Sequence, residues 1–184
     1  MQEKADVLNE AGQLTGLQET KQEIFQSGHW RLVVHLWIVD PKTRQLLVQQ
    51  RASKKGIFDD LWDVSVGGGV QAGESSATAI IRETGEELGL KINKVEIKLL
   101  GRFKVPKFIP ERQQQMNEYS DTFLVFRKLD LSTLRLQPDE VADVRLIGLQ
   151  DFKNEINNQL VYEHWVPHSA EYYNQAIDLI LKNL

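Results

Sequence analysis

The chain of 184 residues contains no cysteine. Without cysteine there is no disulfide, no thiol nucleophile and no thiolate to bind a metal. Disulfides are rare where thiols are kept reduced, so a reducing compartment is compatible with this composition. Disulfide scaffolds and thiol chemistry are therefore excluded.

An excess of positive charge is also lacking, since 22 Lys and Arg stand against 26 Asp and Glu and the formal net charge is −4. Nucleic-acid backbones are bound through basic surfaces, so we expect no nucleic-acid partner. No apolar run approaches the length of a membrane span, and residues 1–6 lack the apolar core of a signal peptide. We therefore expect no membrane partner and a cytoplasmic location.

The composition that remains is that of a globular protein, with 41% hydrophobic and 26% charged residues. The length fits one domain with a sizeable core. We expect a single domain over residues 1–184, in which residues 1–28 form an N-terminal extension.

The most informative feature of the chain is a regular pattern of glycine and charged residues. Five residues separate its first two positions, seven separate the second from an Arg-Glu pair, and two separate that pair from a Glu-Glu pair. Along the chain these positions are Gly68, Glu74, Arg82, Glu83, Glu86, Glu87, Gly89 and Leu90.

The same segment predicts a helix. Ser75 or Ser76 is a suitable N-terminal cap, because a serine oxygen accepts from an unpaired backbone N–H. Gly89 is a suitable end, because glycine adopts the left-handed conformation without steric cost. An apolar stripe recurs at helical spacing and consists of Ala77, Ile80, Ile81, Thr84 and Leu88.

Glu83, Glu86 and Glu87 lie on another face of this helix, where neighbours at such spacing are about 5–6 Å apart between Cβ atoms. Carboxylates this close repel one another, and hard divalent cations that prefer oxygen ligands would offset the repulsion. A charge run is usually a solvated helix face. The fixed spacing and the glycine-rich turn before the helix favour the functional interpretation.

The pattern resembles the Nudix box, the signature of enzymes that hydrolyse a nucleoside diphosphate linked to another group. The one departure is Thr84, where the family prefers an aliphatic residue, and threonine keeps the β-branched shape. The resemblance implies a box over residues 68–90. It also implies an α/β fold, the Nudix α/β/α sandwich with a mixed β-sheet.

The resemblance further implies roles for the box residues. The metal ligands it implies are Glu83, Glu86 and Glu87 with a backbone carbonyl near Gly68, and the metal is Mg²⁺ or Mn²⁺. Glu74 and Arg82 are expected to form a structural pair that orients these ligands, because a guanidinium can hold a carboxylate through two hydrogen bonds.

Hydrophobic periodicity and turn residues predict elements consistent with this fold. The expected strands are two short ones within 5–17, then 30–39, 45–51, 64–69, 94–103, 117–127 and 143–147. The expected helices are one or two turns within 19–27, the box helix, 151–157 and 170–182. A long polar loop is expected over residues 104–115.

Outside the box, the chain is similar to the branch of the family related to isopentenyl diphosphate isomerase. The similar segments include Leu47-Val-Gln-Gln-Arg51 and Leu61-Trp-Asp-Val-Ser-Val. The isomerase needs a cysteine acid, and Gly67 stands at that position here. Gly69 and Arg31 stand at the positions of two ligand histidines. The resemblance implies the scaffold without the isomerase machinery.

Glu118 is the candidate for a general base or an additional metal ligand beyond the box. Asn117-Glu118 matches an Asn-Glu segment of the isomerase, and Met116 replaces the glutamate before it. The alternatives are an ordinary exposed strand residue, with Glu83 or Glu86 as the base. A register slip of one residue would turn Glu118 away from the site.

The evidence for a functional role is weaker for the other polar residues. Arg51, Lys54 and Lys55 are candidates for contacts with substrate phosphates, although exposed lysines are commonly just solvated. His35 is expected to be a core histidine. His164 and His168 have a metal-like spacing, but Pro167 argues against one continuous helix, and we expect them at the surface or an interface.

The sequence thus predicts a metal-dependent hydrolase that cleaves a diphosphate linkage in a small nucleotide or nucleoside diphosphate derivative. The alternatives are a non-catalytic nucleotide-sensing Nudix module and the isomerase itself. The intact box argues against the sensor, and Gly67 argues against the isomerase. A small diphosphate is the expected partner, and a homodimer is left open.

Overall fold

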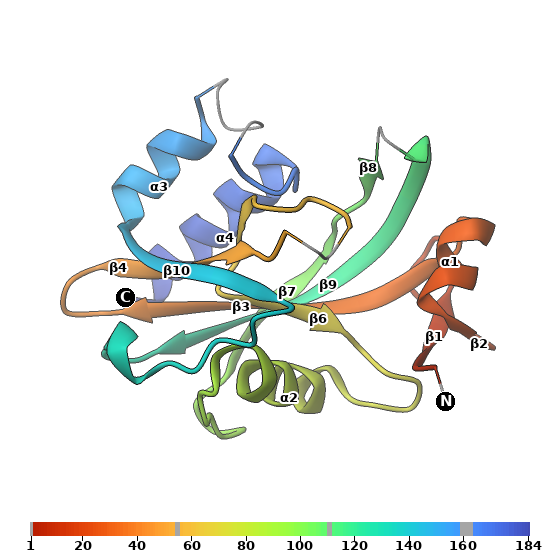
Figure 1. Ribbon diagram of the computed structural model, residues 1–184, viewed down its shortest axis with the longest axis horizontal. Coiled ribbons are helices and arrows are strands. Elements are labelled where there is room, and N and C mark those ends of the chain that lie inside the picture. Colours follow the sequence, from red (N-terminus) through yellow and green to blue (C-terminus); the bar gives the residue numbers. More distant parts are fainter. Residues whose placement is uncertain (1, 54–55, 110–111, 159–163) are drawn as a thin grey trace.

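The structure is a computed structural model that describes residues 2–53, 56–109, 112–158 and 164–184 (Figure 1). Lys54 and Lys55, two of the candidates for substrate binding, lie outside the described residues. Among the described residues, no helix is both long enough and apolar enough to cross a membrane.

The N-terminal residues form a hairpin and a short helix, as predicted. β1 (Lys4–Leu8) and β2 (Leu14–Thr20) pair antiparallel, and β1 also pairs with β3. α1 (Lys21–Ser27) begins with a capping box in which the Thr20 side chain accepts from the Glu23 backbone and the Glu23 carboxylate accepts from the Thr20 backbone. The helix ends at Gly28, which has φ 66°.

The long strand β3 (Trp30–Asp40) organises a mixed sheet. It pairs antiparallel with β6 (Val66–Gly69) and, near its end, with β4 (Gln45–Arg51). It pairs parallel with β9 (Gln114–Phe126). The sheet is extended by β5 (Trp62–Asp63), β7 (Lys98–Lys104), β8 (Lys107–Ile109) and β10 (Val141–Gly148).

Helices cover both faces of this sheet (Figure 1). α2 (Ser76–Leu88) lies on one face, and α3 (Leu149–Ile156) and α4 (Ala170–Asn183) lie on the other. A short 3₁₀ helix, η2 (Leu131–Thr133), lies between β9 and β10. The α/β/α sandwich with a mixed sheet is therefore confirmed.

Alternation along β3 divides the buried apolar side chains between two cores, because successive strand residues point to opposite faces. Val34, Leu36 and Ile38 pack with side chains of α2 such as Ile80. Trp37 and Val39 instead pack in the core that contains α3 and α4 residues. His35 has the same parity as Trp37, so its side chain lies on the α4 face.

Several predicted boundaries differ from the structure, and two differ most. The loop expected over residues 104–115 contains β8, which pairs with the start of β9 and extends the hairpin. The strand expected from Lys94 begins at Lys98 instead. The preceding residues form a turn, in which the Glu96 carboxylate accepts from the backbone and side chain of Asn93.

Candidate active site

The box helix α2 has the local signals that its sequence predicted. Ser75, rather than Ser76, is the N-terminal cap and accepts from the Thr78 backbone N–H at 3.2 Å. Gly89 ends the helix with φ 63°. Thr84 is buried and its hydroxyl donates to the Ile80 carbonyl at 2.6 Å, so the polar atom is satisfied within the helix.

The glycine-rich strand β6 lies directly against this helix. A β-carbon built on Gly68 would overlap the carboxylate of Glu83. Only a residue without a side chain allows the backbone of β6 to approach Glu83 this closely. The first glycine of the pattern, Gly68, is therefore in contact with the glutamate of the Arg-Glu pair, Glu83.

Arg82 connects the loop before the helix to the carboxylates on the helix. Its guanidinium donates to both oxygens of Glu74, at 3.1 and 2.9 Å, and to the Gly69 carbonyl at 3.1 Å. It also donates to Glu83 at 2.8 Å and to Glu86 at 3.1 Å. The contacts required for an orienting pair are present, and the orienting role stays a prediction.

The three helix glutamates occupy different environments. Burial raises the pKa of Glu83, the nearby charges of Glu86 and Glu140 raise it further, and Arg82 only partly opposes this. Glu86 is exposed. Glu87 is 2% exposed, which argues against the alternative of a solvated helix face for this residue. One of its oxygens accepts from the Gln49 side chain at 3.1 Å.

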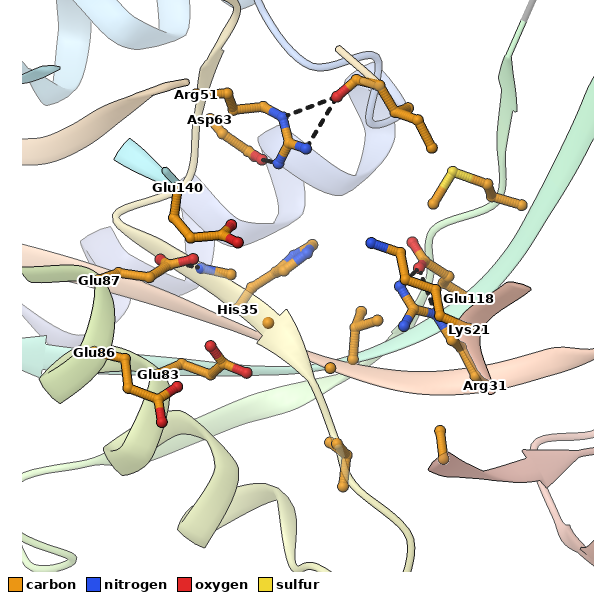
Figure 2. Close-up of a pocket in the computed structure, with 18 of the residues that line it drawn as sticks. Lys21, Arg31, His35, Arg51, Asp63, Glu83, Glu86, Glu87, Glu118 and Glu140 are labelled. Atoms are coloured by element: carbon orange, nitrogen blue, oxygen red, sulfur yellow. Dashed lines mark hydrogen bonds and ion pairs between the residues drawn. The ribbon is translucent and has the colours of Figure 1, made fainter. Parts of the chain in front are cut away.

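A cavity of about 670 Å³ opens beside these residues. One side presents Glu83, Glu86, Glu87 and Glu140 (Figure 2). Glu140 could not be predicted from the sequence, because it lies in a polar turn before β10 with no fixed spacing from the box. Lys21 and Arg31 lie together with Glu118 on the other side (Figure 2), and Lys107 bonds Glu118 there, whereas Arg51 lies beside Asp63.

The acidic side of the cavity suits a hard divalent cation. Carboxylate oxygens are the ligands that Mg²⁺ prefers, and a carboxylate such as Glu83, whose burial raises its pKa, gains most from a nearby cation. Among the described residues, no three His, Asp or Glu side chains already converge as a metal site. Arg82 bonds one carboxylate oxygen of Glu83 and one of Glu86.

Glu118 lines the same cavity as Glu83 and Glu87, on the opposite side (Figure 2). The parallel register of β3 and β9 places it directly beside Arg31. Its carboxylate accepts from Arg31 Nε at 2.9 Å and from Lys107 Nζ at 2.6 Å. Burial raises the pKa of Glu118, but the two cations outweigh burial and hold it well below the usual range.

The role of Glu118 as a base stays a prediction, and these ion pairs weigh against it, because a strongly stabilised carboxylate is a poor proton acceptor. Arg31, Gly69 and Met116, three positions at which the chain departs from the isomerase, line the cavity with Glu118. A β-carbon on Gly69 would lie 3.3 Å from Arg31 Nη1, and Met116 lines the same cavity. A guanidinium therefore stands where the resemblance placed a ligand histidine.

Arg51 also lines the cavity, but several of its donors are engaged within the protein. Its guanidinium donates to the carbonyls of Ile57 and Phe58 at 3.0–3.3 Å. Its Nη1 lies 3.6 Å from the Asp63 carboxylate. Arg51 therefore holds the segment after β4 in place, and its contact with substrate stays a prediction.

The structure agrees with the expectations for His35 and His164 and contradicts the one for His168. His35 is buried, and its Nδ1 lies 2.6 Å from the Tyr172 hydroxyl, as expected for a core histidine. His168 was expected at the surface or an interface but is only 3% exposed, with Nε2 2.9 Å from Asp63. The chain around Trp165 pairs with Trp62 of β5 and carries His168 next to Asp63. His164 is exposed.

Comparison with known proteins indicates one family. The NUDIX domain family matches residues 29–168. An uncharacterized Nudix hydrolase of Listeria monocytogenes is 34% identical over 151 residues, which cover 82% of this chain and 83% of that protein. Nudix hydrolase 3 of Arabidopsis thaliana is 29% identical over 97% of this chain, which spans only 23% of that longer protein.

Other similarities concern the isomerase branch and the fold. Isopentenyl-diphosphate Delta-isomerase of Escherichia coli O127:H6 is 33% identical over 78% of this chain and 75% of its own length. The crystal structure of DR0079 from Deinococcus radiodurans superposes with a TM-score of 0.70 and 21% identity, covering 94% of this chain and 98% of that chain. The family match and the Listeria relative together show that the chain belongs to the Nudix family.

Proposed function

We propose that the chain is a hydrolase that depends on Mg²⁺ or Mn²⁺ and cleaves a diphosphate linkage in a small nucleotide or nucleoside diphosphate derivative. The observation that carries the proposal is the contact of Gly68 with the half-buried Glu83, beside Glu86 and Glu87 at one cavity. The similarity to Nudix hydrolases of comparable length supports the same reaction class.

The helix glutamates are the residues that would hold the metal. Glu83, Glu86 and Glu87 supply carboxylate oxygens, and the Gly68 carbonyl is the backbone ligand that we propose. When bound, the metal neutralises phosphate oxygens and favours attack by water. Arg82 keeps the loop and the helix together through Glu74, so the ligands stay aligned with the cavity.

Proton transfer from the attacking water is better served by Glu83 than by Glu118. A general base works best when its pKa lies near the operating pH. Burial raises the pKa of Glu83, whereas Lys107 and Arg31 overcome burial and lower the pKa of Glu118. We therefore propose a helix carboxylate as the base and a binding role for the region around Glu118.

The dimensions of the cavity support a small substrate. Its volume of about 670 Å³ lies within the range of about 300–1,000 Å³ that is usual for small-molecule sites. Basic side chains opposite the glutamates would attract phosphate groups. The net charge of −4 gives no comparable support for a nucleic-acid substrate.

The decisive experiment is a metal-dependent product-release screen over a panel of nucleoside di- and triphosphates and nucleotide conjugates. We expect turnover of at least one compound with Mg²⁺ or Mn²⁺, no turnover in excess chelator, and loss of turnover in Glu83→Gln. Binding of a nucleotide without turnover of any panel member would instead support a sensing module.

A further inference from the structure

Three buried charged residues on the basic side of the cavity carry an excess of positive charge. We call Arg31, Lys107 and Glu118 the cationic triad. Their side chains are 10%, 5% and 3% exposed, respectively. The two cations share the single carboxylate of Glu118, and neither forms a second ion pair with any described residue. The triad therefore has a formal charge of one positive unit.

An excess charge inside a protein is costly, because burial removes the solvation of the charged form. The nearest other partner of Lys107 is the carbonyl of Val105, at 3.3 Å. Asp63, another carboxylate of the cavity, is bonded to His168 and lies near Arg51. A triad of this kind gains free energy when an anion is supplied from outside.

The triad is open toward the cavity. All three members line it, and Figure 2 shows Lys21 directed to the same corner. Arg31 bonds Glu118 through Nε and Nη2, whereas its Nη1 faces Gly69, where a β-carbon would lie 3.3 Å away. Because residue 69 is glycine, it has no side chain to cover this side of the guanidinium.

We propose that the cationic triad is an anion subsite that binds an oxyanion of the substrate, a terminal phosphate or a carboxylate. Arg31 and Glu118 lie on a different side of the cavity from the acidic residues of α2 (Figure 2), and Lys107 bonds Glu118 there. The substrate class is therefore a diphosphate that carries a second anionic group away from the bond that is cleaved. This assignment of the substrate class rests on the proposed function, whereas anion binding at the triad does not.

Titration of the full chain with inorganic phosphate, in chelator and at constant ionic strength, tests the subsite directly. Lys107→Met removes the excess charge and leaves the Arg31–Glu118 pair neutral, so we expect affinity about tenfold weaker or more, as for a lost charged hydrogen bond. Glu118→Gln raises the charge of the triad, and we expect tighter binding. Lys104→Met, an exposed residue that does not line the cavity, changes the net charge equally and should bind as wild type does.

Thermal unfolding establishes which variants are folded, and if neither triad variant folds, the wild-type titration provides the test, because no phosphate binding by wild type would overturn the proposal. Equal phosphate affinity in wild type and Lys107→Met, or no tightening in Glu118→Gln, would overturn the proposal. A parallel titration with acetate distinguishes the two kinds of anionic group. Tighter binding of phosphate indicates a phosphate group of the substrate, and tighter binding of acetate indicates a carboxylate. The titration contains no metal, so its result tests phosphate binding at the triad even if the chain is not a hydrolase.

Discussion

Gly68 and Glu83 are in such close contact that a β-carbon on the glycine would occupy the space of the carboxylate. The two residues come from different elements, β6 and α2. The absence of a side chain at residue 68 thus leaves the space that the Glu83 carboxylate occupies.

Gly68→Ala should therefore displace the Glu83 carboxylate and reduce turnover by about tenfold to a thousandfold, since small misplacements at a catalytic centre are costly. Gly67→Ala is the matched control. Its β-carbon would have ordinary contacts, the nearest at 3.4 Å from Val64. Steady-state rates of both variants, with circular dichroism as a fold check, measure the difference. Similar rates for the two variants would contradict the assigned role of the Gly68–Glu83 contact.

Metal dependence should follow the protonation of Glu83. Burial raises the pKa of this carboxyl, and a protonated carboxyl does not bind a divalent cation. We expect Mg²⁺ affinity, measured by calorimetry, to fall as the pH drops through a pKa above the ordinary glutamate value of about 4.3.

Glu83→Gln and Glu87→Gln should lower turnover by orders of magnitude, because each removes a charged ligand. Glu10→Gln, an exposed residue outside the cavity, makes the same change in charge and should leave the rate unaltered. Full turnover of a good substrate in excess chelator would falsify the metal requirement.

Glu118→Gln should destabilise the fold at neutral pH by about 3–5 kcal/mol, because it leaves two buried cations without their carboxylate. Burial raises the pKa of Glu118, but the cations hold it well below its usual range. As the pH falls, Glu118 of the unfolded chain therefore takes up a proton at about pH 4.3, and Glu118 of the folded chain does so only at a lower pH.

The stabilisation from Glu118 is fully present above that pH and is lost as the pH falls further. Urea unfolding at several pH values should show a steeper loss of unfolding free energy towards acid pH for wild type than for Glu118→Gln.

The hydrolysis rate of folded Glu118→Gln tests the base role separately, since loss of a general base typically lowers the rate by about 10²–10⁴-fold. A near-normal rate would assign the base to the helix carboxylates.

Incubation with isopentenyl diphosphate should give no dimethylallyl product, although the isomerase of Escherichia coli is 33% identical. The chain has no cysteine to supply the acid. Arg31 and Lys107 already hold Glu118, the residue that matches an isomerase glutamate. Chromatography of the products, with an active isomerase as positive control, measures the outcome, and interconversion above the protein-free background would refute this placement.

Much of the box helix was readable from the sequence because its determinants are local. Ser75 and Gly89 act on backbone groups within one turn of the helix. The β-branched and aromatic residues of 30–39 likewise predicted a buried strand, since such side chains fit a pleated sheet. The polar face of α2 was harder, because spacing alone did not distinguish the exposed Glu86 from the buried Glu87.

The partners of the site residues were decided by the tertiary structure. Glu118 meets Arg31, 87 residues away, only because β9 pairs parallel with β3 in one register. His168 meets Asp63 across 105 residues because the chain near Trp165 returns to β5. Strand register and chain return depend on the packing of the whole sheet, which no short segment contains. The sequence by itself therefore determined the box, its helix and the absence of thiol chemistry, whereas the fold decided that Glu118 is held between two cations.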